Sequence, residues 1–223
     1  MDKTRWDKLA AAGGIVGVVL FVIGFLVAGS PPTVDDSAQT VADFFSDNRT
    51  AVLWSVFLQG LGVLAILWFV AALVTTMGDA GESRLAAAAF GSFLLVFSIG
   101  SVAALTRATL AYSVSDEGPD FVLPLYHLAL IIDVVGGLLV AGLFAAVGGA
   151  TLRAGIFPRW WGWVSGLAAL WAIVNATAWG RDGFWSPTGA VGFVGLLVFL
   201  GWILVTSILL TMRTREGTSA EAA

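Results

Sequence analysis

The chain has 223 residues, of which 58% are hydrophobic and 12% are charged, and its formal net charge is −4. A soluble domain carries about twice that share of charged residues, so the composition excludes a soluble globular protein. The apolar residues run in blocks near the roughly 20 residues that cross a bilayer as a helix, which also excludes a transmembrane β-barrel with its short alternating strands. The chain has no cysteine and one histidine, His127, so it cannot build a thiolate site or a histidine cluster. We therefore expect no metal and no other cofactor.

Six hydrophobic segments follow one another along the chain. They cover residues about 9–29, 51–77, 85–113, 122–153, 161–179 and 188–212. Because no linker divides them, the sequence predicts a single membrane domain over residues 1–223, an all-α bundle of six transmembrane helices. The tail over residues 214–223 is small and polar, and we expect it to be disordered.

The first segment has a second interpretation. The basic residues Lys3, Arg5 and Lys8 precede an apolar stretch, as they do in a secretory signal peptide. The apolar stretch ends near Gly29 and is about 20 residues long, against about 7–15 in a signal peptide. Its length favours an uncleaved first helix.

Basic residues outside the segments gather on one side of a six-pass arrangement. That side carries Lys3, Arg5, Lys8, Arg84, Arg153, Arg159, Arg213 and Arg215. The other side carries Arg49 and Arg181, with Asp35, Asp36, Asp43, Asp47, Asp116, Glu117, Asp120 and Asp182. Since lysine and arginine are retained in the cytoplasm, we expect both termini to be cytoplasmic in a multi-pass protein of a bacterial-type cell (cytoplasmic) membrane.

The longest outer link, residues about 36–49, has the pattern of a short amphipathic helix. Asp36 or Ser37 can cap it, and the apolar residues Val41, Phe44 and Phe45 share one face. We expect this helix to lie on the outer surface, either as a simple covering segment or as a lid over the bundle.

Tryptophans and glycines complete the pattern of a membrane bundle. The tryptophans at segment ends are expected to be interface anchors, and they are Trp6, Trp160, Trp161 and Trp163 on one side and Trp54, Trp179 and Trp185 on the other. Closely spaced glycines let helix backbones approach one another, and they are Gly13, Gly17, Gly136, Gly137, Gly189, Gly192 and Gly195.

Five strongly polar side chains fall within the predicted segments, all in the outer half of the membrane: Gln59, Arg107, His127, Asp133 and Asn175. A charge at such a depth costs roughly 2.5–3.5 kcal/mol to insert, so Arg107 and Asp133 each require a partner or a function. Helical side chains lean toward the N-terminus of their helix. Because the third and fourth segments run in opposite directions, the two side chains lean toward each other, and we predict that they pair.

The predicted pair has three interpretations. It can fix the packing and register of two helices, in which case breaking it would cost about 3–5 kcal/mol. It can centre a polar pocket open to the outside that binds a small solute, a lipid headgroup or a peptide, with Gln59, His127 and Asn175 as further binding residues. It can belong to a proton or ion pathway, although the inner half holds only serine and threonine, which we expect to bond to their own helix backbone.

Structural interpretations also exist for the other three residues. Gln59 and Asn175 are typical of interhelical hydrogen bonds, and His127 is typical of a hydrogen-bonded histidine near the interface. The sequence disfavours a serine-dependent enzyme, because the serine and the histidine of its active site must be adjacent. Ser165 lies near the inner end of its segment and cannot meet His127 near the outer end. No paired carboxylates or phosphate-binding glycine loop accompany them.

The sequence therefore predicts a non-enzymatic membrane protein with a polar binding pocket that faces outward. The expected partners are the lipid bilayer, a small solute or lipid headgroup from the outer side, or another membrane protein, and we expect no nucleic acid. A small-solute or ion-coupled transporter and an accessory subunit of a membrane complex are the alternatives.

Two stretches carry a resemblance to a known group of proteins. They are DSAQTVADFF, from Asp36 to Phe45 before the second segment, and FPRWWGW, from Phe157 to Trp163 at the start of the fifth. In these stretches the chain resembles a group of uncharacterised six-pass bacterial membrane proteins of unknown function. The resemblance implies the six-pass architecture over nearly the whole chain, and it implies no activity and no binding residues.

Overall fold

The computed structural model describes residues 3–114 and 119–221, with the side chains of residues 6, 8–114 and 121–213. These residues form helices and links and contain no strand, which confirms the all-α prediction. The helices are α1 (Lys3–Ala28), α2 (Ala38–Asp47), α3 (Arg49–Asp79), α4 (Ser83–Ser113), α5 (Pro119–Ala154), α6 (Arg159–Asn175) and α7 (Ala190–Glu221). Asp116 and Glu117, two of the acidic residues used to predict the orientation, lie outside the described residues.

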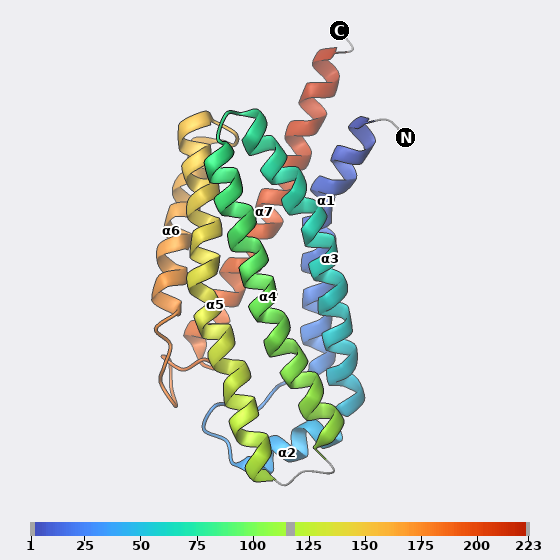
Figure 1. Ribbon diagram of the computed structural model, residues 1–223, viewed down its shortest axis with the longest axis vertical. Coiled ribbons are helices and arrows are strands. Elements are labelled where there is room, and N and C mark those ends of the chain that lie inside the picture. The colour runs from blue at the N-terminus through green and yellow to red at the C-terminus, as the bar shows by residue number, and fades with distance from the viewer. Residues whose placement is uncertain (1–2, 115–118, 222–223) are drawn as a thin grey trace.

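The longer helices stand side by side, and the short α2 lies across one end of them (Figure 1). α1 contacts α3 and α7, and contacts then follow from α3 to α4, α5, α6 and back to α7. The long helices thus form a closed ring. We call the end covered by α2 the roof end, and the opposite end, where α1 begins and α7 ends, the terminal end.

Five helices are long and apolar enough to cross a membrane within the described part of the chain. They cover Lys8–Ala28, Arg49–Asp79, Ser83–Ser113, Phe121–Ala154 and Ala190–Arg213. These helices indicate a multi-pass membrane protein. The predicted segment 161–179 becomes α6, which has 17 residues and is not among the five.

α6 ends at Asn175 and not near Trp179 as predicted. The chain beyond it folds into turns, in which the Thr177 hydroxyl donates to the Val174 carbonyl at 2.7 Å and the Trp185 indole donates to the Thr177 carbonyl at 2.8 Å. These bonds satisfy one carbonyl in the last turn of α6 and one just beyond it, so the apolar residues after Asn175 do not extend the helix.

The prediction of a disordered tail differs from the structure, in which α7 continues as a helix to Glu221. Once a helix has formed, each further residue adds one backbone hydrogen bond at little cost, so a polar composition alone does not end it. Near the end of the apolar part, the Arg213 guanidinium donates to the Ile156 carbonyl at 2.5 Å and ties α7 to the link between α5 and α6.

The predicted amphipathic helix is α2, and it packs onto the bundle. Ser37 is its N-cap and accepts a hydrogen bond from the Thr40 backbone at 3.1 Å, which decides between the two predicted caps. Val41 and Phe45 are buried, and the Phe45 ring lies edge-on to Tyr126 of α5 at 5.9 Å. The apolar face of α2 therefore covers the roof end and does not face a membrane surface.

Glycine spacing predicted several of the close approaches. A Cβ on Gly13 would lie 2.4 Å from the Ala65 carbonyl oxygen, so α1 and α3 touch through their backbones. Gly17, Gly137 and Gly195 also face neighbouring helices. Gly189 and Gly192 instead face carbonyls of the preceding link, and Gly136 faces open space, so the packing interpretation is wrong for those three.

Trp161 is not the interface anchor that its position predicted. It is 4% exposed, and its indole donates to the Thr206 hydroxyl at 3.1 Å, while Trp202 donates to the Ser165 hydroxyl at 2.9 Å. Ser207 likewise donates to the Ala11 carbonyl on α1 at 2.5 Å. The prediction that buried hydroxyls serve only their own helix is therefore wrong, because two indoles and a neighbouring helix use them.

A series of aromatic rings crosses the interior of the ring of helices. Successive ring contacts run from Phe21 through Phe97, Phe199, Phe144 and Trp202 to Trp161, with centroids 4.7–6.5 Å apart. We call these six residues the aromatic column. It joins α1, α4, α7, α5 and α6 across the centre of the ring.

Candidate functional site: a charged pair on inward helix faces

Arg107 and Asp133 each lie two residues beyond an exposed apolar residue, Leu105 on α4 and Ile131 on α5. Two residues correspond to about 200° around a helix, so both charged residues lie on the side of their helix that faces away from lipid. Their neighbours one turn away on those sides are buried, including Ala111 and Ala129, which are both 0% exposed. The charges therefore point into the ring of helices.

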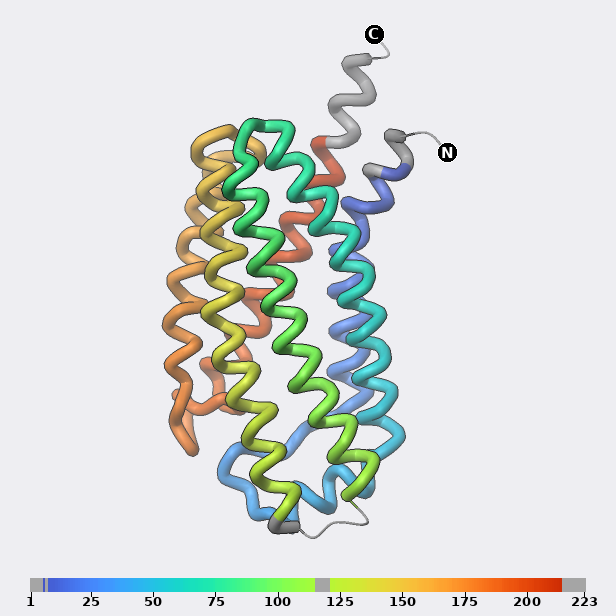
Figure 2. Tube along the Cα trace, in the orientation of Figure 1, coloured from blue at the N-terminus to red at the C-terminus, as the bar shows by residue number. Residues whose placement is uncertain are grey.

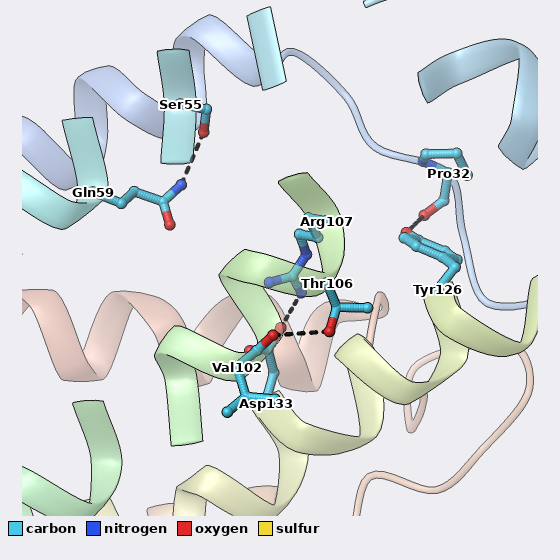
Figure 3. A network of polar contacts seen from close by, with 8 residues as sticks. All are labelled: Pro32, Ser55, Gln59, Val102, Thr106, Arg107, Tyr126 and Asp133. Carbon is cyan, nitrogen blue, oxygen red and sulfur yellow. Dashed lines mark hydrogen bonds and ion pairs between the residues drawn. The ribbon is translucent and has the colours of Figure 1, made fainter. Parts of the chain in front are cut away.

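The Arg107 guanidinium and the Asp133 carboxylate form an ion pair that joins α4 to α5 (Figure 3). The predicted contact between these two residues is thus present. The Arg107 side chain nevertheless remains 29% exposed and the Asp133 side chain 47% exposed. Since both residues lie on inward faces, this exposure indicates that side chains do not fill the space around the pair.

Apolar packing closes the roof end directly beyond the pair. Leu110, one turn from Arg107, and Leu130, one turn from Asp133, belong to one buried cluster with Val41 and Phe45 of α2. The straight path from the roof end between α3, α4 and α5 is therefore filled. Access to the pair requires a path on the side of α1 and α7, or a movement of α2.

A backbone strap crosses the roof end before α2 begins, and Figure 2 traces it from the end of α1. Tyr126 of α5 donates its hydroxyl to the Pro32 carbonyl. The next residue, His127, bonds through Nε2 to the Val34 carbonyl at 3.1 Å, and the Val34 amide donates to the Thr188 hydroxyl at 3.1 Å. We call residues 29–37 the strap. His127 thus holds the strap and is not part of the charged pair.

Gln59 and Asn175 also have structural partners away from the pair. Gln59 donates to the Ser55 hydroxyl at 2.9 Å on its own helix and lies against Gly24 of α1. Asn175 donates to the Val191 carbonyl at 2.7 Å, which joins the end of α6 to the first turn of α7. Of the five predicted residues, the structure brings only Arg107 and Asp133 into contact.

Sequence reasoning missed the role of Tyr126, which is 1% exposed. A tyrosine in an apolar helix needs a partner for its hydroxyl, and this requirement is a usable signal. No pattern in the sequence marks Pro32 or Thr188 as the other ends of the strap contacts.

The pair offers two opposite charges side by side. One guanidinium nitrogen and one carboxylate oxygen form the bond, so Arg107 retains further N–H donors and Asp133 retains an acceptor oxygen. Such a surface can bind an anion, a cation or a zwitterion. Elsewhere in the described chain, the Ser165 hydroxyl accepts from Trp202 and His127 holds the strap, so these two do not form a nucleophile and base.

Comparison of the chain with protein-family models, curated proteins and solved structures finds no match. The resemblance of its two sequence stretches to six-pass bacterial proteins therefore brings no function to the chain.

Proposed function

We propose that this protein is a non-enzymatic receptor of the cell membrane that binds a small polar solute or a lipid headgroup at Arg107 and Asp133. The observation that carries the proposal is the exposure of these two side chains, 29% and 47%, on helix faces that are otherwise buried. The partial exposure supports a site that a ligand can reach.

The direction of access follows from the aromatic column. Phe97 lies ten residues from Arg107 toward the terminal end, about 15 Å along α4. The rings of the column contact one another across the interior at that level, and no charged side chain belongs to the column. This favours a site reached from the outer half, beside α1 and α7 or after a movement of α2, over a transporter, which needs a route through both halves.

The membrane orientation belongs to the same proposal. α1 begins and α7 ends at the same end of the bundle, which requires an even number of crossings (Figure 1). With its 17 residues α6 is about 25 Å long, close to the roughly 30 Å hydrocarbon core, so we include it as the sixth crossing. The surplus of basic residues at the terminal end supports cytoplasmic termini and an outward roof end.

Solute binding tests this proposal. The purified protein would be heated in the presence of acetate, phosphate, glycine or choline, which sample anions, zwitterions and cations. We expect at least one class to raise the melting temperature of the wild type, and Arg107→Gln and Asp133→Asn to abolish the rise. Asp43→Asn, an exposed substitution on α2, is the matched control and should retain it. If no class produced a rise that depends on the pair, the pair would be a packing contact.

A further inference from the structure

A second pair of opposite charges lines a cavity at the terminal end, where α3 and α7 leave the bundle. The cavity has a volume of about 260 Å³ and is lined by Thr76, Asp79, Ala80, Leu210 and Arg213. It lies at the end of the molecule opposite to the Arg107–Asp133 pair and shares no residue with it. Its ligand is therefore independent of whatever binds at that pair.

Asp79 is the last residue of α3 and its position is electrostatically unfavourable. The C-terminal end of a helix carries a partial negative charge, which favours a cation and disfavours a carboxylate. No hydrogen bond or ion pair joins the Asp79 side chain to another side chain that the structure describes. The site thus presents a carboxylate and a helix C-terminus to the same cavity, and both attract a positive group.

Arg213 supplies the opposite charge and is held in place. One guanidinium N–H donates to the Ile156 carbonyl at 2.5 Å, which fixes the side chain against the link between α5 and α6. The guanidinium retains other donors in a planar arrangement that suits two phosphate oxygens. Although Asp79 and Arg213 line one cavity, they do not form an ion pair with each other among the described contacts. The two charges are therefore separated and available.

The position of the cavity along the helices indicates which groups of the bilayer surround it. Asp79 ends the apolar span Arg49–Asp79. Arg213 follows the last apolar residues of α7, where the sequence turns polar. Residues at the ends of apolar spans lie at the polar interface of the bilayer, where lipid headgroups are concentrated. The volume is below the roughly 300–1,000 Å³ of pockets for drug-sized ligands, so it suits one small group.

We propose that this cavity binds a phosphate ester that carries a primary ammonium group, the chemistry of a phosphoethanolamine headgroup. The ammonium donates to the Asp79 carboxylate at the C-terminal end of α3, and the phosphate accepts from the Arg213 guanidinium. A quaternary ammonium has no N–H to donate to Asp79, and a glycerol headgroup has no positive charge. The cavity should therefore distinguish these headgroups by the ammonium.

Binding by the full chain in mixed micelles tests the proposal with defined probes. The probes are phosphatidylethanolamine, phosphatidylcholine and phosphatidylglycerol with identical acyl chains, and soluble phosphoethanolamine. We expect phosphatidylethanolamine to bind best, and Asp79→Asn to weaken its binding about fivefold, the effect of one charge near a membrane surface. The same variant should not weaken binding of phosphatidylglycerol, because that headgroup has no ammonium to donate to the carboxylate and its own negative charge is repelled by it.

Control variants separate this site from general charge effects and from misfolding. Arg84→Gln removes an exposed arginine at the same end, and Asp182→Asn removes an exposed aspartate, so both should bind phosphatidylethanolamine like the wild type. Arg213→Lys keeps the charge and should lose less affinity than Arg213→Gln. If soluble phosphoethanolamine bound as tightly as the lipid, the ligand would be a free solute of the same chemistry. Equal binding of the three lipids, or no effect of Asp79→Asn, would overturn the proposal.

Discussion

The guanidinium of Arg107 and the carboxylate of Asp133 form an ion pair between α4 and α5 while both side chains remain partly exposed inside the ring of helices. The contact could be predicted from the opposite directions of the two helices. The exposure could not, because it depends on how side chains from distant parts of the chain pack around the pair.

Arg107→Ala should lower the free energy of unfolding by about 1–2 kcal/mol, because it leaves Asp133 without its partner. The value is smaller than that for a fully buried pair, since the 29% and 47% exposure lets solvent screen the charge. Adding Asp133→Ala should recover part of the loss. Unfolding by titration with dodecyl sulfate in mixed micelles measures all three variants. A double variant no more stable than Arg107→Ala would show that the two charges are not coupled.

Tyr126→Phe should loosen the strap, because the ring still packs on Phe45 while the hydrogen bond to the Pro32 carbonyl is lost. We expect a loss of about 1 kcal/mol in stability and faster proteolysis between residues 29 and 37. Tyr112→Phe is the control, since Tyr112 is 67% exposed, and it should leave both quantities unchanged. Equal proteolysis of the two variants would mean that the Tyr126 hydroxyl does not hold the strap.

Thr206→Val should destabilise the terminal half of the bundle by about 1–3 kcal/mol. The substitution keeps the shape of the side chain but leaves the buried indole N–H of Trp161 without its acceptor. Thr75→Val removes an exposed hydroxyl that bonds only to the Ala71 carbonyl on its own helix, and it should be nearly neutral. Chemical denaturation monitored by tryptophan fluorescence compares the two. Similar losses would indicate that the Trp161 bond contributes nothing beyond the helix effect.

Gly13→Ala should cost about 1–3 kcal/mol, because the new Cβ would lie 2.4 Å from the Ala65 carbonyl oxygen and would push α1 away from α3. Gly60→Ala places the same methyl group in open space and should be neutral or stabilise α3 by up to about 1 kcal/mol. Thermal unfolding of the two variants gives the comparison. A neutral Gly13→Ala would contradict the close contact between α1 and α3.

Patterns in the sequence predicted the features that depend on residues close together in the chain. The shared apolar face of Val41, Phe44 and Phe45 and the capping residue Ser37 predicted α2, and glycine spacing predicted the approach of Gly13 to a neighbouring helix. Features that depend on distant partners were missed. Trp161 was assigned to the interface because it lies at the start of a predicted segment. It is buried instead, and its indole donates to the Thr206 hydroxyl of α7.

In the candidate site, too, the features that depend on distant residues were not predicted. Depth placed the five polar residues in the outer half of the membrane, but depth does not determine the direction in which each side chain points around its helix. Gln59 and Asn175 face neighbouring helices, and His127 faces the strap, so only two of the five meet. The end of α6 was also hard to predict. The helix ends at Asn175, where the Thr177 hydroxyl, and not a further helical amide, donates to the Val174 carbonyl.

Labelling with an impermeant thiol reagent tests most directly whether water reaches the charged pair. The chain has no cysteine, so each introduced cysteine is unique. Gly100→Cys lies two turns from Arg107 on the same inward face, in open space, and leaves the pair intact. Leu138→Cys faces lipid and is the negative control, and Asp43→Cys on α2 is the positive control. We predict that Gly100→Cys and Asp133→Cys react from the outside and not from the cytoplasmic side. Absence of labelling from either side, with a reactive Asp43→Cys, would contradict an accessible site.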